Sequence, residues 1–141
     1  RPLTALFLHA DGAHLCGNIV AGVFVFATVL PIFGRGRGWL LIALASILAN
    51  FAAAAASYSQ PYRSLGASTA VFAGLGLLTG AAIRQVVAGQ KSRLWRQVMV
   101  PLAASLGLLA LFGSGGLHTD LTAHLMGLAS GIAFGWFGRR S

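Results

Sequence analysis

Charged residues are scarce in this sequence, and acidic residues are almost absent. Only 9% of its 141 residues are charged and only 2 are Asp or Glu, whereas hydrophobic residues make up 57% and the mean hydropathy is +0.79. A soluble globular domain carries roughly 25% charged residues, so this composition excludes an ordinary soluble protein. It predicts a protein that lies in a membrane.

Cysteine is nearly absent as well. Cys16 is the single cysteine, so the chain forms no internal disulfide and its sequence does not indicate a redox compartment. A lone thiol within an apolar stretch is typical of helix packing, which is the interpretation that we favour for Cys16.

The sequence contains long hydrophobic runs in place of charged residues and cysteines. Five of them contain no Asp, Glu, Lys or Arg, and they cover residues 15–33, 38–56, 68–83, 97–113 and 121–138. Each approaches the roughly 20 residues that an α-helix needs to span a bilayer. We therefore predict an all-α polytopic membrane protein, folded as one transmembrane domain over residues 1–141. The first residue is Arg1 and no secretory leader pattern follows it, which indicates a truncation or processing point rather than a signal peptide.

The basic residues, 10 in number, give a net charge of +8, and most of them fall on one side of the membrane if the five spans alternate. That side receives the residues that follow the first, third and fifth spans: Arg35, Arg37, Arg84, Lys91, Arg93, Arg96, Arg139 and Arg140. The other side holds Arg1 and Arg63 with both acids, Asp11 and Asp120. The positive-inside rule then places the first side in the cytoplasm and the N-terminus of this chain outside. This segregation argues against nucleic-acid binding, which a basic chain could otherwise indicate. The alanine-, glycine- and arginine-rich composition is compatible with a bacterial inner membrane.

Several polar residues lie in or beside these runs, near their predicted outer ends. Ser68 begins the third span and His124 lies near the start of the fifth. Three more open the first span: His9, His14 and Asn18. Polar side chains in a membrane are costly to bury and are typically functional. Because His9, His14, Ser68 and His124 lie at a similar predicted depth, we expect them to form one site.

Small residues provide a way to bring Ser68 and His124 together. The fifth span repeats them at intervals of four, at Ala123, Gly127, Gly131 and Gly135, and the third span region is rich in them at Gly66, Ala70, Gly74, Gly76 and Gly80. Such ladders let two helices approach closely in lipid. Generic membrane packing, without any catalysis, would produce the same pattern, so the ladder alone leaves both interpretations open.

The residue types suit acyl transfer. A serine hydroxyl becomes a good nucleophile when a base takes its proton, and histidine suits that task near neutral pH. The predicted spans contain no carboxylate, so a Ser68–His124 dyad is expected rather than a triad. His14 and Asn18 are four residues apart and share a helical face. With the Ser68 N–H they could stabilise an oxyanion, whereas a purely structural hydrogen bond between helices is the alternative for Asn18.

Three short stretches together resemble the rhomboid family of intramembrane proteases. One has two histidines and an asparagine at the spacing of the family signature: His9-Ala10-Asp11-Gly12-Ala13-His14-Leu15-Cys16-Gly17-Asn18. Gly66-Ala67-Ser68 resembles the family's Gly-x-Ser nucleophile motif. The final-helix histidine motif is matched by Ala123-His124-Leu125-Met126-Gly127, with Gly131 following. The motifs stand in the family's order and together cover essentially the whole chain.

The resemblance implies a catalytic role for four of the matched residues. Ser68 would be the nucleophile, and His124 the general base and then the general acid. His14 and Asn18 would form the oxyanion hole with the backbone amide of Ser68. The implied reaction is hydrolysis of peptide bonds in or near transmembrane segments of membrane-protein substrates, within the lipid bilayer and without a metal or organic cofactor.

The resemblance to the rhomboid family also implies that four further residues support the catalytic ones. His9 would lie near a water-filled mouth, and Gly66 would permit a tight turn before the nucleophile. Phe72 would pack beneath the His124 ring, although an ordinary apolar contact explains it equally well. Gly127 would belong to the motif around His124.

The sequence departs from the family pattern in several respects, of which two bear most on the fold and the site. The family core has six helices, so we expect its first helix and the outer loop after it to precede Arg1. Thr69 follows the serine where glycine is usual, and a β-branched side chain is stiffer and could narrow the substrate cleft.

Two other classes of function stay open. A non-proteolytic rhomboid-like scaffold, or a complex subunit that binds transmembrane helices, would accommodate Thr69. A channel, transporter or metal protein would use the histidines as ligands, but their spacing matches no compact zinc motif.

Overall fold

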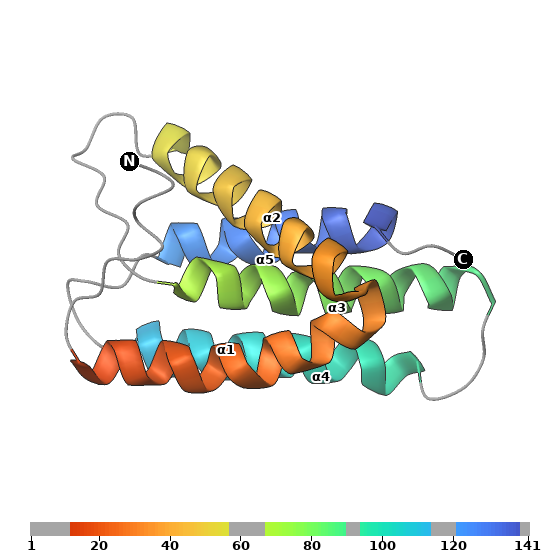
Figure 1. The fold of residues 1–141 in the computed structure, drawn as a ribbon, viewed down its shortest axis with the longest axis horizontal. Coiled ribbons are helices and arrows are strands. Elements are labelled where there is room, and N and C mark those ends of the chain that lie inside the picture. Colours follow the sequence, from red (N-terminus) through yellow and green to blue (C-terminus); the bar gives the residue numbers. More distant parts are fainter. Residues whose placement is uncertain (1–11, 57–66, 90–93, 114–120, 139–141) are drawn as a thin grey trace.

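The described part of the computed structural model comprises residues 12–56, 67–89, 94–113 and 121–138. It forms five α-helices (Figure 1), which are α1 Gly12–Phe33, α2 Arg35–Ala56, α3 Ser68–Val87, α4 Leu94–Gly113 and α5 Leu121–Gly138. No strand occurs in these ranges. The predicted all-α fold is therefore confirmed.

Four of these helices are long and apolar enough to cross a membrane. They are α1 from Leu15 onward, α2, α3 and α5, with mean hydropathies from 1.2 to 2.1. In α4 the apolar segment within the described residues is shorter, Arg96–Ala110. The protein is an integral membrane protein built as a helical bundle, and the fourth predicted span is the weakest of the five.

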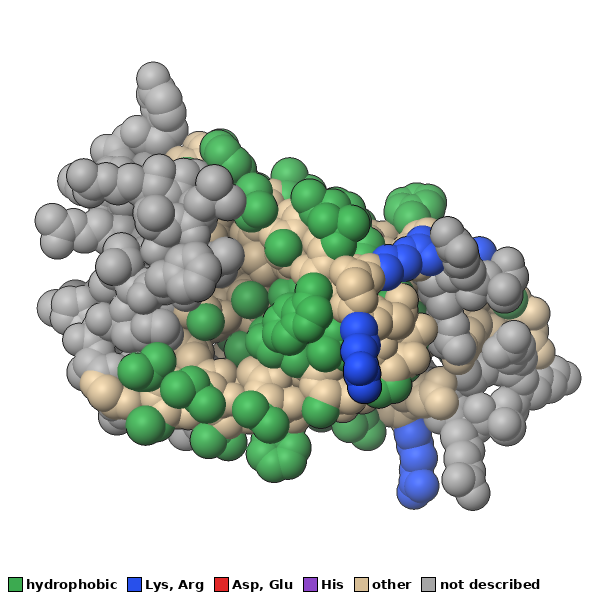
Figure 2. Space-filling view, in the orientation of Figure 1, with side chains coloured by type: hydrophobic (Ala, Val, Ile, Leu, Met, Phe, Trp, Pro, Cys, Tyr) green, Lys and Arg blue, Asp and Glu red, His purple; other side chains and the backbone are tan. Residues whose placement is uncertain are grey.

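Successive helices run in opposite directions, so the helix ends fall into two sets (Figure 1). One end of the bundle, here called the site end, holds the starts of α1, α3 and α5. The opposite end, here called the basic end, holds the starts of α2 and α4, where Arg35 and Arg96 lie. Figure 2 shows the Lys and Arg side chains of the described residues gathered toward this end, beside a largely hydrophobic surface. The helices therefore separate Ser68 and His124 from the described basic residues.

The central helix is α3. It contacts each of the other four helices, and 61% of its membrane-spanning window is buried, compared with 22% for α1. Its apolar residues form much of the core, including Val71, Leu75 and Leu77. This central position buries the first residues of α3, among them Ser68 and Thr69.

The close packing of α3 against α5 depends on glycines, which have no side chain. A Cβ on Gly131 would collide with the backbone oxygen of Ala73, and a Cβ on Gly135 would collide with that of Leu77. Backbone atoms also form the opposing surface of α3, since a Cβ on Gly76 would collide with the backbone oxygen of Leu128. Backbones in such contact are typical of small-residue seams in membranes. The predicted close crossing of these two helices is confirmed.

Candidate active site

Ser68 and His124 form a buried hydrogen-bonded pair. His124 Nε2 lies 2.7 Å from Ser68 Oγ. His124 is 3% exposed and Ser68 is 2% exposed. Ser68 is the first residue of α3, and His124 lies one turn inside α5. The close crossing of these helices thus joins two residues that are 56 positions apart in the sequence.

Gly127 lets α5 approach the first turn of α3. A Cβ at this position would lie 2.8 Å from the backbone oxygen of Thr69 and 3.2 Å from Phe72 Cβ. Both distances are shorter than ordinary van der Waals contact. Because Gly127 lies three residues after His124, the room that it leaves also sets how near the imidazole comes to Ser68.

Thr69 faces α5. It is 1% exposed, and its Cγ2 would lie 3.4 Å from a Cβ on Gly127. In the described structure this methyl group therefore contributes to the helix seam beside the Ser68–His124 pair. The sequence indicated only that a β-branched residue stands next to the serine.

The imidazole of His124 is held flat against Phe72. The ring centroids are 4.6 Å apart and the rings are inclined by 22°. Phe72 is fully buried one turn after Ser68 on α3, so the helix that carries the serine also positions the ring of the histidine. The predicted contact between Phe72 and His124 is confirmed. Asp11 and Asp120, the only carboxylate residues in the chain, lie outside the described residues.

Asn18 is buried in α1 without a polar partner in the described structure. Its side chain is 3% exposed, and neither Oδ1 nor Nδ2 has a hydrogen bond within the described ranges. Leaving a buried amide unsatisfied costs about 1–3 kcal/mol. The alternative that Asn18 ties helices together by a hydrogen bond has no contact to support it here.

The other predicted site residues are only partly placed. His14 belongs to α1 and lies one turn before Asn18, so their backbone positions share a helical face, but its side chain is not described. His9 and Gly66 lie outside the described residues. The first-turn hydrogen bonds of α3 are donated by Ala70 and Val71 to the oxygen of Ala67. Ser68 precedes both donors, at the helix terminus where backbone N–H groups lack helical partners.

Ser130 connects α5 to α2 through a hydrogen bond that the sequence analysis did not predict. Its hydroxyl lies 2.9 Å from the oxygen of Ala45 on α2 and 3.1 Å from the oxygen of Gly127 on its own helix. This contact fixes α5 against α2 close to the glycine that admits His124. A serine three residues beyond Gly127 was the available signal, but serines that bond only within their own helix look the same in sequence, as Ser46 and Ser105 do.

Comparison with known proteins gives two findings. A family model described as "Rhomboid domain" matches residues 1–141. The Rhomboid protease GluP of Bacillus subtilis (strain 168) is 32% identical over 132 residues, which are 94% of this chain and 24% of that relative. The chain thus spans about a quarter of the relative's length.

Proposed function

The chain belongs to the rhomboid family, and from this premise we propose that it forms the core of an intramembrane serine endopeptidase. Its substrates would be membrane proteins, cleaved in or near their transmembrane segments. The observation that carries this proposal is the buried hydrogen bond of 2.7 Å between Ser68 Oγ and His124 Nε2. The relative described as a rhomboid protease supports the same class of activity.

The proposed reaction uses Ser68 as nucleophile and His124 as proton carrier. As Ser68 Oγ attacks the scissile carbonyl carbon, its proton passes to His124 Nε2. The imidazolium then gives this proton to the leaving nitrogen, so the peptide C–N bond breaks and an acyl-enzyme remains. Water, deprotonated by His124, attacks the ester carbonyl, and the proton returns to Ser68 Oγ as the carboxylic acid product leaves. No metal or organic cofactor takes part in this scheme.

The oxyanion would be bound by Asn18, His14 and the backbone N–H of Ser68. Asn18 supports this assignment because its amide is buried and lacks a partner in the described structure. A donor that is already desolvated needs little reorganisation when charge develops on the substrate oxygen. Phe72 would keep the imidazole plane aligned while its protonation state changes.

Orientation in the membrane follows from the distribution of charge. We propose that the basic end of the bundle faces the cytoplasm and the site end faces outward, because Arg35, Arg37, Arg84 and Arg96 lie at the basic end and such residues accumulate on the cytoplasmic side. Substrate segments would then be cleaved near the outer face of the membrane.

A fluorophosphonate probe tests the dyad directly. We expect the full-length protein in liposomes to be labelled at Ser68, and we expect Ser68→Ala and His124→Ala to abolish labelling. Ser46→Ala is the matched control, because Ser46 is also buried but bonds only to its own helix, through the oxygen of Ile42. It should be labelled like the parent protein.

Two results would contradict the proposal. Labelling that survives in a folded Ser68→Ala protein would place the reactive nucleophile elsewhere. A folded parent protein that reacts with no probe and cleaves no transmembrane substrate would favour the non-proteolytic scaffold, which Thr69 beside the serine accommodates.

A further inference from the structure

Thr69 is a buried residue between α3 and α5 that the proposed reaction does not use. It follows Ser68 directly on α3, and only 1% of its surface is exposed. A Cβ on Gly127 of α5 would lie 3.4 Å from Thr69 Cγ2, which is an ordinary contact distance. The methyl group of the threonine therefore occupies space between the two helices, next to the Ser68–His124 pair.

The backbones of α3 and α5 leave more room at this position than farther along α5. A Cβ on Gly131 or Gly135 would collide with a backbone oxygen of α3, and the three nearest atoms around each are backbone atoms. At Gly127 the nearest atom, the backbone oxygen of Thr69, would be 2.8 Å away, and the next two belong to the side chains of Phe72 and Thr69. Among these three glycines, side chains of α3 thus complete the contact only at Gly127.

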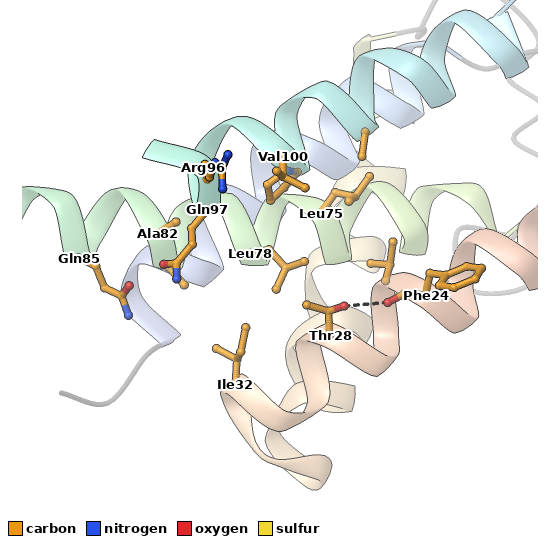
Figure 3. A pocket seen from close by; sticks show the side chains of 14 residues that line it. Phe24, Thr28, Ile32, Leu75, Leu78, Ala82, Gln85, Arg96, Gln97 and Val100 are labelled. Carbon is orange, nitrogen blue, oxygen red and sulfur yellow. Dashed lines mark hydrogen bonds between the residues drawn. The ribbon is translucent and has the colours of Figure 1, made fainter. Parts of the chain in front are cut away.

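The place of Thr69 on α3 explains why its side chain meets α5. Thr69, Gly76 and Gly80 are seven and four residues apart, so they share a helical face, and a Cβ on either glycine would collide with the backbone of α5. A cavity of about 640 Å³ between α1, α3 and α4 lies on another side of α3, where Leu75 lines it (Figure 3). Thr69 does not line this cavity. Its side chain is therefore placed to affect the distance between α3 and α5 rather than this open space.

We propose that Thr69 is a positioning residue for the Ser68–His124 pair, with its methyl group acting as a spacer between α3 and α5. Its effect on turnover rests on the proposed protease function. A β-branched side chain is stiff at χ1, so the methyl group keeps a fixed position, and its removal would leave a void into which the helices relax in part. Because Thr69 adjoins Ser68 and Gly127 lies three residues after His124, such a shift moves Ser68 Oγ relative to His124 Nε2, which are 2.7 Å apart.

Two substitutions distinguish the methyl group of Thr69 from its hydroxyl group. Thr69→Ser removes the methyl group and keeps the hydroxyl, whereas Thr69→Val keeps the branched shape and removes the hydroxyl. In the full-length protein in liposomes, we expect Thr69→Ser to lower kcat for a transmembrane substrate about 10–10²-fold with little change in KM, because a small misplacement of reacting groups slows catalysis strongly. Thr69→Val should retain the kcat of the parent protein.

Thr79→Ser is the matched control. Thr79 is also a buried threonine of α3, and its hydroxyl donates to the backbone oxygen of Leu75, a bond that serine can keep. The substitution therefore removes the same buried methyl group from the same helix, away from Ser68 and His124. We expect Thr79→Ser to keep the kcat of the parent protein, even where thermal unfolding shows that both serine variants lose similar stability.

The Ser68–His124 hydrogen bond is also observable without turnover, through the NMR chemical shift of His124 Nε2 in nanodiscs. The resonance is assigned by its loss in His124→Ala, and Ser68→Ala gives its position when the partner hydroxyl is absent. We expect Thr69→Ser to move the resonance toward that position, and Thr69→Val and Thr79→Ser to leave it unchanged. This measurement tests the spacer even if the parent protein cleaves no substrate, in which case the proposed function alone would be wrong.

Four outcomes would overturn the proposal. A Thr69→Ser protein with the kcat and the His124 resonance of the parent would mean that the methyl group is not needed. A loss of kcat in Thr69→Val but not in Thr69→Ser would assign the role to the hydroxyl. A lower KM in Thr69→Ser at unchanged kcat would mean that Thr69 narrows the substrate cleft instead. Equal effects of Thr69→Ser and Thr79→Ser on kcat would make Thr69 an ordinary buried residue of α3.

Discussion

At the scale of single residues, a substitution of Asn18 can distinguish a role in the proposed catalysis from a role in folding stability. Its amide is buried and, within the described part of the chain, has no hydrogen-bond partner. Such a group contributes little to folding, since a buried amide without a partner has lost its bonds to water. In the proposed reaction it would bind the oxyanion, because a desolvated donor stabilises charge more strongly than an exposed one.

We therefore expect Asn18→Ala to lower kcat about 10²–10³-fold while KM changes little and the midpoint of thermal unfolding does not fall, because the substitution removes a buried amide that is unsatisfied in the described structure. The physical reason is that the lost hydrogen bond would form in the transition state and not in the resting protein. Cleavage kinetics on a transmembrane substrate and thermal unfolding in the same detergent measure both quantities. The control, Ser46→Ala, loses a hydrogen bond within α2 and should keep its kcat. A fall in unfolding temperature that accounts for the lost activity of Asn18→Ala would make Asn18 a structural residue.

At the scale of helices, the site depends on how closely α5 lies against α3. The seam is formed by backbone against backbone, with Gly131 beside Ala73 and Gly135 beside Leu77. Interactions of this kind are weak per atom and depend on close approach. The small residues of α5 therefore serve the site through geometry, since they set the distance at which His124 meets Ser68.

We expect Gly131→Ala to destabilise the protein by about 1–3 kcal/mol, because its Cβ would collide with the oxygen of Ala73 and crowd the Cα of Gly76. The matched control is Gly107→Ala on α4, where an added Cβ meets nothing within 4 Å. This substitution should stabilise its helix by about 0.5–1 kcal/mol. Unfolding by SDS in mixed micelles compares the two variants. Equal effects would mean that the α3–α5 seam tolerates a wider separation than its contacts indicate.

A comparison of the predicted spans with the observed helices shows how well the sequence predicted where each helix begins and ends. The expected span at 121–138 coincides with α5, and those at 15–33, 38–56 and 97–113 end where α1, α2 and α4 end but begin slightly after them. The third span was predicted too short at its end, because Arg84 was taken as its limit although it lies inside α3; Arg37 and Arg96 likewise lie inside α2 and α4. Long basic side chains can remain in a helix at the membrane surface while their charges reach water. Arg84 also donates to the oxygen of Trp136 at the last turn of α5.

At the scale of the whole molecule, the sequence predicted that Ser68 and His124 meet, whereas it did not predict the cavity between α1, α3 and α4. Ser68 and His124 are polar residues in apolar runs, so they stand out in the sequence, and the small residues of the third and fifth spans predicted that their helices cross closely. The cavity lining consists mostly of ordinary apolar residues from three helices, such as Leu78 and Val100. No residue type or spacing marks such a cavity, because it results from the angles at which the helices pack.

The arrangement of charge on the whole molecule predicts the side from which each helix end can be reached. In a Cys16→Ala background, Gly12→Cys introduces a thiol at the site end and Gly36→Cys introduces one at the basic end; both positions are exposed and have room for a side chain. We expect a membrane-impermeant maleimide to label Gly12→Cys in intact cells and Gly36→Cys only after permeabilisation, since Arg35 and Arg37 favour the cytoplasmic side for their helix end. Labelling by a permeant maleimide controls for reactivity of the two thiols. The reverse pattern would place Ser68 and His124 toward the cytoplasm, and the proposed cleavage near the outer face would then be wrong.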